Sequence, residues 1–255
     1  MLMLLSTLAA SVLLLQEAAF FCSASSVNVD DLLATMTLEE KIGQMNQIDI
    51  TVFVDESIPG LINYTLMEEW ITQYKIGSIL NSPFSMGPIN GKVSFTPSEW
   101  REVIHNIQTI SQKYADTEAA IPIMYGIDSI HGASYVYEAT LFPQQLATAA
   151  TFNTSRSYDA GRITAQDTLA AGIPWLFSPV LGLALNPLWA RFWETFGEDP
   201  YLAARMGEAL VKGLQATEGY ETSVPPRAAA CMKHFIAYSN PSTGHDRAPV
   251  QLPDR

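Results

Sequence analysis

The chain has 255 residues, of which 48% are hydrophobic, enough for one large domain with a substantial core or for part of one. Its 14 lysine and arginine residues are outnumbered by 26 aspartate and glutamate residues, which gives a formal net charge of -12. Because binding to a phosphate backbone needs clustered cations, this balance argues against a partner made of nucleic acid.

The amino terminus is strongly apolar. Leu2 to Leu15 form an almost uninterrupted hydrophobic run that is short for a membrane span, and Cys22 and Ala24 fit the small-x-small cleavage pattern of secretory signal peptides. The sequence therefore predicts a signal peptide over residues 1–24. It also predicts a secreted, extracellular protein with no membrane contact after cleavage. An uncleaved anchor is the alternative, and the polar residues at positions 16 and 17 argue against it.

Two further features agree with secretion. Asn63-Tyr-Thr and Asn153-Thr-Ser are acceptor sequences for N-glycosylation. Cys231 is the single cysteine of residues 25–255, so this region is expected to rely on core packing and not on an internal disulfide.

Helix starts are well marked along the rest of the chain. Thr37 with Glu40 and Thr96 with Glu99 form two capping boxes, and a third helix is predicted to begin near Asp199. Helical periodicity predicts that the second and third of these helices bury the following residues: Trp100, Val103, Ile104, Ile107, Tyr114, Leu202, Met206, Leu210 and Leu214.

Short apolar runs alternate with these helical segments, which is typical of parallel βα units. Six strands are predicted, at residues 45–48, 76–80, 121–125, 146–150, 175–178 and 228–232. The predicted fold is α/β, a (β/α)8 TIM-type barrel over residues 25–255 that is incomplete and contains about the first six βα units.

In a parallel barrel the chemistry lies where strands end and loops begin, so polar residues at those junctions identify the candidate site. Asp128 follows the strand predicted at 121–125. Lys233 and His234 directly follow the strand predicted at 228–232, and Arg191 lies in an aromatic segment beyond the strand at 175–178.

These motifs together resemble glycoside hydrolase family 3, which contains many β-glucosidases and exo-β-glucanases. The resemblance runs from about Leu32 to Arg255 and rests on five segments in order: Met36-Thr-Leu-Glu-Glu-Lys-Ile-Gly-Gln-Met45, Tyr125-Gly-Ile-Asp-Ser-Ile-His-Gly132, Thr140-Leu-Phe-Pro143, Phe192-Trp-Glu-Thr-Phe-Gly-Glu-Asp-Pro200 and Lys233-His-Phe235. It implies an exo-acting, retaining hydrolase of β-glucosides or β-glucans that uses no cofactor and no metal ion.

The resemblance assigns Asp128, Arg191, Lys233 and His234 to the sugar at the non-reducing end of the substrate. Their chemistry suits that role, because a carboxylate accepts hydroxyl protons, guanidinium and ammonium groups donate, and an imidazole does either. A buried lysine beside a histidine also needs a polar partner or a ligand.

Simpler roles remain open for two of these residues. Asp128 could cap a turn, and Arg191 could pair with Glu194 or Glu198 along the chain. We interpret Trp189 and Trp193 as packing residues and not as platforms for a sugar ring.

Two histidines in the loops are not expected to bind the substrate. His131 is expected to orient the loop that carries the candidate aspartate, and His245 is expected to be a surface residue.

Retaining hydrolysis needs two carboxylates, one as nucleophile and one as general acid/base. The resemblance implies a nucleophile on the seventh strand and an acid/base in a following domain, so both are expected beyond Arg255. Asp246 and Asp254 follow the Lys-His pair in a stretch that does not read as a strand, and neither is assigned a catalytic role. The chain by itself is therefore expected to be inactive.

Two other functions remain as alternatives. One is a carbohydrate-binding protein without catalytic activity, and the other is an unrelated barrel lyase or aldolase in which Lys233 forms a Schiff base.

Overall fold

The computed structural model describes residues 28–113, 121–215 and 228–252. The predicted signal peptide at residues 1–24 lies outside these ranges. Within them, no helix combines the length and the apolar character needed to cross a bilayer. Cys231 is a free thiol.

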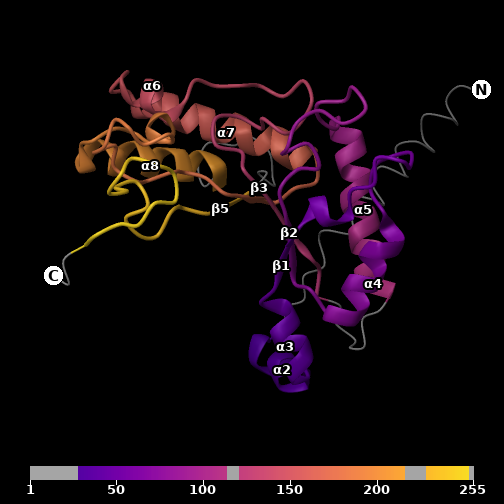
Figure 1. The fold of residues 1–255 in the computed structure, drawn as a ribbon. Helices are drawn as coiled ribbons and strands as arrows, with labels where there is room; N and C mark the ends of the chain where they lie inside the picture. Colours follow the sequence, from indigo (N-terminus) through magenta and orange to yellow (C-terminus); the bar gives the residue numbers. More distant parts are fainter. Residues whose placement is uncertain (1–27, 114–120, 216–227, 253–255) are drawn as a thin grey trace, which may run out of the picture.

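The centre of the fold is a parallel sheet whose five described strands follow one another in chain order (Figure 1). The strands are β1 (Gln47–Asp49), β2 (Ser78–Leu80), β3 (Met124–Ile127), β4 (Trp175–Leu176) and β5 (Ala229–Ala230). Each pairs with the next in parallel register. Sequential parallel strands joined by helical crossovers are the arrangement of a TIM-type barrel, so the predicted incomplete α/β barrel is confirmed.

Five of the six predicted strands are present, but the strand predicted at residues 146–150 is wrong. That segment forms the helix α6 (Gln145–Ala149). Its sequence is rich in alanine, the strongest helix former, and poor in the β-branched residues that favour strands. The buried amide of Gln145 donates to the carbonyl oxygen of Val180 over 2.9 Å, which ties α6 to the loop after β4.

Both predicted capping boxes are confirmed. The hydroxyl of Thr37 accepts a bond from the amide of Glu40 at 3.2 Å, and the Glu40 carboxylate accepts from the Thr37 amide at 2.7 Å. Thr96 and Glu99 make the same exchange at 3.3 and 2.8 Å. The remaining helical segments are α2 (Val29–Thr35), α3 (Leu38–Gln44), η1 (Ile50–Phe53), α4 (Tyr64–Tyr74), α5 (Pro97–Lys113), α7 (Thr154–Ala170), η2 (Phe192–Glu194) and α8 (Pro200–Gln215).

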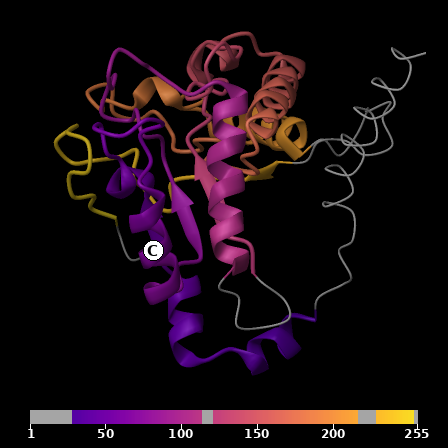
Figure 2. The same cartoon turned by 90° about the vertical axis from the view of Figure 1, so that its right-hand side faces the viewer.

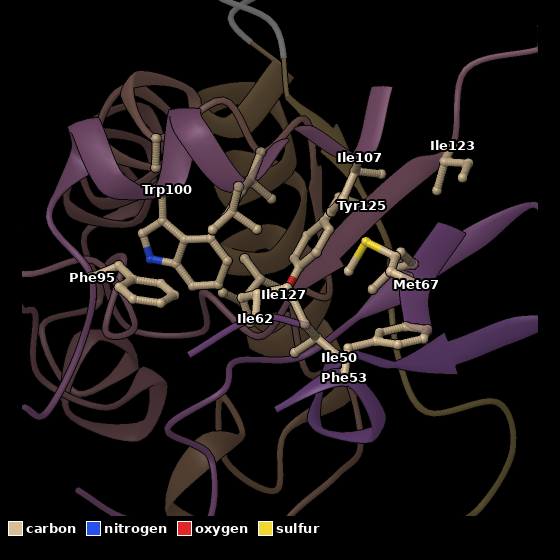
Figure 3. Packing of buried hydrophobic residues seen from close by; sticks show 14 of the residues in the cluster. Ile50, Phe53, Ile62, Met67, Phe95, Trp100, Ile107, Ile123, Tyr125 and Ile127 are labelled. Carbon is tan, nitrogen blue, oxygen red and sulfur yellow. The ribbon is translucent and has the colours of Figure 1, made fainter. Parts of the chain in front are cut away.

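One hydrophobic core lies between the first three strands and the helices α4 and α5. The indole of Trp100 is fully buried and meets the rings of Phe95 and Tyr125 edge-on, with centroids 5.4 and 5.7 Å apart (Figure 3). Val103 and Ile107 are also buried, as predicted. Of the other two residues predicted on this face, Ile104 is partly buried and Tyr114 lies outside the described residues.

A second core lies where α7 and α8 pack side by side over β4 and β5 (Figures 1 and 2). Met206, Leu210 and Leu214 are buried there, as the helical periodicity predicts, and Leu202 is partly buried. The buried hydroxyl of Ser157 on α7 donates to the carbonyl oxygen of Met206 on α8 over 2.8 Å.

The close approach of α7 and α8 depends on glycine. A methyl group at Gly213 would overlap the carbonyl oxygen of Tyr158 on α7 and would lie 2.9 Å from the amide nitrogen of Arg162. A methyl group at Gly207, on the same helix, would instead meet the end of the flexible Leu181 side chain at 2.6 Å. The two glycines therefore form a matched pair for testing this contact.

Gly213→Ala is expected to lower the melting temperature by about 3–6 °C, because overpacking costs about 1–3 kcal/mol and outweighs the gain in helix propensity. Gly207→Ala is expected to leave it nearly unchanged, because the leucine side chain can rotate away. Thermal unfolding followed by circular dichroism compares the two. Equal melting temperatures would contradict the proposed role of Gly213 in the helix contact.

Candidate active site

A pocket with a cavity volume of about 450 Å³ opens where the strands end. Asp128 directly follows β3, Lys233 and His234 follow β5 by three and four residues, and Arg191 immediately precedes η2. All four predicted site residues therefore line one cavity. Its full lining is Gln47, Leu80, Asp128, Ile130, Tyr135, Phe177, Arg191, Glu194, Lys233 and His234.

The first polar pair in the pocket joins the end of β3 to the segment after β5. The ammonium group of Lys233 donates to Oδ1 of Asp128, and the two side chains are 13% and 35% exposed. The backbone of Lys233 is held by bonds with the segment after β4, from its amide to Pro179 at 3.0 Å and from the amide of Leu181 at 2.8 Å. The Asp128 carboxylate thus accepts from a lysine of a distant segment, and the turn-capping alternative does not describe it.

The second polar cluster is centred on Arg191. Its Nε and Nη2 donate to Oε2 of Glu194 at 3.0 and 2.5 Å, and its Nη1 lies 3.2 Å from Nε2 of His234. The local pairing with Glu194 that the spacing suggested is therefore present. It does not remove Arg191 from the pocket, because all three side chains line the cavity.

The contact with Arg191 fixes the protonation of His234. Since a guanidinium group only donates, Nε2 of the imidazole accepts and the proton of the neutral ring is on Nδ1. Burial lowers the pKa of His234 to about 4, and the nearby charges of Arg191 and Lys233 act in the same direction. His234 is therefore neutral at physiological pH and can offer its Nδ1–H group to a ligand.

This lowered pKa predicts a loss of stability in acid. The unfolded imidazole takes up a proton near its ordinary pKa of 6.5, whereas the folded one does so only near 4. The unfolded state binds more protons between these values, so the free energy of unfolding falls as the pH drops through this window. Because the ring is partly exposed, solvent screening leaves an effect of about 1 kcal/mol.

Urea unfolding at a series of pH values measures this effect. His234→Gln removes the ionisable group and should flatten this part of the acid profile, whereas His245→Gln, at an exposed position outside the pocket lining, should retain it. Identical profiles for wild type and His234→Gln would contradict the assignment.

Three polar residues of the pocket were not predicted as site residues, namely Gln47, Tyr135 and Glu194. The sequence suggested Glu194 only as an ion-pair partner, and no sequence signal pointed to Gln47 or Tyr135. The carbonyl oxygen of Tyr135 accepts from the Ser94 hydroxyl at 2.5 Å and from the Trp100 indole at 2.8 Å, which fixes the backbone behind its side chain. Burial raises the pKa of the Tyr135 phenol, so it remains a hydrogen-bond donor.

The two tryptophans near the arginine differ. Trp189 is buried with 1% exposure, which confirms the packing interpretation. Trp193 is 61% exposed and lies outside the pocket lining, so it packs at the surface and not in the core. It lies on η2, a segment of three residues, where its ring meets Phe192 with centroids 5.5 Å apart.

The loop that carries Asp128 is held as predicted. Nδ1 of His131 lies 2.9 Å from the carbonyl oxygen of Phe142, and the amide of Phe142 donates to the carbonyl oxygen of His131 at 2.8 Å. His131 is not part of the pocket lining, and His245 is exposed, as expected.

Both predicted glycosylation asparagines are helix N-caps. Asn63 accepts from the amide of Leu66 at the start of α4, and Asn153 accepts from the amide of Ser155 at the start of α7, each at 3.0 Å. Asn153 is exposed, whereas Asn63 is partly buried. Glycosylation remains a prediction at both positions.

Comparison with known proteins adds independent information. The model of the glycosyl hydrolase family 3 N terminal domain matches residues 37–255. The lysosomal beta glucosidase of Dictyostelium discoideum is 44% identical over 242 residues, which are 94% of this chain and 29% of that protein. The chain thus spans less than a third of the length of this relative.

Solved structures agree. A variant of the exo-1,3/1,4-beta-glucanase from a Pseudoalteromonas species matches with a TM-score of 0.73 and 28% identity, over 89% of this chain and 34% of that one. The beta-glucosidase from Listeria innocua in complex with isofagomine matches with a TM-score of 0.65 and 29% identity, over 89% of this chain and 28% of that one.

Proposed function

Since the chain belongs to glycoside hydrolase family 3, we propose that its pocket binds the terminal glucose of β-linked glucosides or glucans for exo-acting hydrolysis with retention. The observation that carries this proposal is the convergence of Asp128, Arg191, Lys233 and His234 from three separate segments on one cavity. Charged donors and acceptors held in fixed directions are the groups that bind sugar hydroxyls most strongly.

The pocket carboxylates support binding better than bond cleavage. Asp128 is paired with Lys233, and Glu194 is paired with Arg191. A retaining enzyme needs a nucleophile and a proton donor about 5–5.5 Å apart on either side of the scissile bond. We assign neither role to these two residues, and we propose that both groups lie beyond Arg255.

Family membership overturns the alternative of an unrelated barrel lyase or aldolase. The geometry agrees, since Lys233 donates to a carboxylate as an ammonium group, whereas a Schiff base requires the free amine. A carbohydrate-binding protein without catalytic activity remains the second candidate. This candidate function uses the same pocket as the proposed hydrolase and differs from it only in that the bound sugar is not hydrolysed.

We also propose that the protein enters the secretory pathway and is extracellular. The apolar run at residues 2–15 and the exposed acceptor Asn153 support this proposal. Protein expressed in a secretory host is expected to carry additional mass that a deglycosylating enzyme removes. This additional mass should be absent from Asn153→Gln.

Titration of the 255-residue chain with glucose, followed by ligand-observed NMR, tests the binding function. Glucitol is the matched control, because it carries similar hydroxyls on an open chain that does not fit a ring-shaped site. Glucose is expected to bind and glucitol is not. Equal signals from both, or none from glucose, would contradict the proposal.

The same preparation tests the assignment of the catalytic groups. No turnover of a nitrophenyl β-glucoside is expected from this chain. Measurable turnover would mean that a residue within it is the nucleophile.

A further inference from the structure

The segment after β5 carries a hydrogen-bonded cluster next to the pocket. The hydroxyl of Tyr238 donates to Oδ1 of Asp246 at 2.6 Å, and Nε1 of the buried Trp189 donates to the same oxygen at 3.3 Å. The rings of Trp189 and Tyr238 meet edge-on with centroids 5.6 Å apart. A shared acceptor and a perpendicular aromatic contact thus hold the ring of Tyr238 in one place.

The ring of Tyr238 also contacts the site residues. Its centroid is 4.6 Å from that of the His234 imidazole, and the Arg191 guanidinium carbon lies 5.7 Å above it. The same ring therefore supports both members of the Arg191–His234 contact. Neither Tyr238 nor Asp246 lines the cavity.

We infer that Tyr238 and Asp246 are positioning residues, which hold His234 and Arg191 in the orientation that binds the sugar. The inference rests on the proposed sugar-binding function. Its physical basis is that Glu194 restrains Arg191 from one side only, while the imidazole turns about its side-chain bonds unless a neighbouring surface restrains it. Small errors in the direction of such donors cost affinity, because a hydrogen bond weakens steeply as its angle departs from linear.

The charge of Asp246 agrees with this role. The hydrogen bond from Tyr238 lowers the pKa of the Asp246 carboxyl, and the indole of Trp189 contributes further. The carboxylate consequently keeps accepting both bonds in mildly acidic solution.

Two nearly isosteric substitutions test the inference in the full chain. Tyr238→Phe keeps the ring and removes its bond to Asp246, while Asp246→Asn keeps the shape and removes the charge. Each is expected to raise the Kd for glucose about tenfold. The double variant is expected to bind about as well as the single ones, because both changes act on the same contact, one by deleting its donor and the other by removing the charge of its acceptor. Tyr201→Phe, at a 73% exposed position on α8, is the matched control and should bind as wild type does.

A second readout separates positioning from general loss of structure. The ring resonances of His234, observed by NMR in the free protein, should shift in Tyr238→Phe, which leaves the charge of Asp246 near the imidazole in place. Glucose affinity equal to wild type in both variants, unmoved His234 resonances, or fully additive losses in the double variant would each overturn the inference.

The outcome also distinguishes this inference from the proposed function. If wild-type protein binds no glucose, the proposed function fails and the His234 resonances alone decide. A shift in Tyr238→Phe then supports positioning of the imidazole, and no shift overturns it.

Discussion

Asp128→Asn is expected to weaken glucose binding by about 100-fold, or about 2.7 kcal/mol, which is the size of one charge-assisted hydrogen bond. The asparagine keeps the shape of the aspartate, but one of its two acceptor atoms becomes a donor. The substitution also removes the carboxylate that forms an ion pair with Lys233. The side chain of Lys233 is only 13% exposed, so its ammonium group then lies in the pocket without this partner. In the proposed enzyme, turnover of an aryl β-glucoside should fall at least as far, because contacts to sugar hydroxyls tighten in the transition state.

Calorimetric titration with glucose measures the loss. Asp159→Asn is the matched control, since Asp159 is exposed on α7 and should tolerate the change without loss of affinity. Asp128→Asn will also lose some stability with its ion pair, so a folded state at the assay temperature must be shown by circular dichroism. Folded Asp128→Asn that binds glucose as well as wild type would refute the assignment of this residue to the sugar.

The positions of Asp128, Lys233 and His234 could be predicted because, in a parallel sheet, the residues that follow the strands lie near the site. A run of apolar residues followed by a polar one identifies a junction, and all such junctions lie on the same edge of a parallel sheet. The strand predictions located β3 and β5 to within a few residues, and the structure places these three side chains in one cavity. Local sequence was sufficient to locate these residues because each βα unit places the residues after its strand on the same edge of the sheet.

Other parts of the site depend on contacts between distant segments, which local sequence does not record. Tyr135 reaches the pocket because Ser94 and Trp100, 41 and 35 residues earlier in the chain, hold its carbonyl oxygen. The helix α6 was predicted as a strand because its short apolar run fits both periodicities. Its buried Gln145, which bonds to Val180, is the tertiary contact that accompanies the helical form.

The sequence also posed a choice that the structure shows to be unnecessary. Pairing of Arg191 with Glu194 was considered an alternative to sugar binding, yet both residues line the pocket and bond to each other. A carboxylate that accepts from Nε and Nη2 fixes the plane of the guanidinium group and directs Nη1 to His234. The ion pair therefore orients the side chain that we propose binds the sugar.

The strongest energetic coupling in the site is expected between Lys233 and Asp128. Lys233→Met leaves a carboxylate without its cation, and Asp128→Asn leaves a mostly buried ammonium group without its anion. Each change should cost about 1–3 kcal/mol of unfolding free energy, less than a fully buried pair would lose because Asp128 is partly exposed. Removing both charges together avoids either penalty.

A double-mutant cycle on these two residues is therefore expected to give a coupling free energy of about 1–2 kcal/mol. The matched control is the exposed pair of Lys113 and Glu68, 2.8 Å apart between α5 and α4, for which Lys113→Met and Glu68→Gln should couple by only about 0–1 kcal/mol. Urea unfolding of the four variants of each cycle supplies the free energies. If the pocket pair couples no more strongly than the surface pair, solvent already screens Lys233 and Asp128 from each other. Their charges would then be free for other partners, and the picture of a preorganised pair of sugar-binding groups would be wrong.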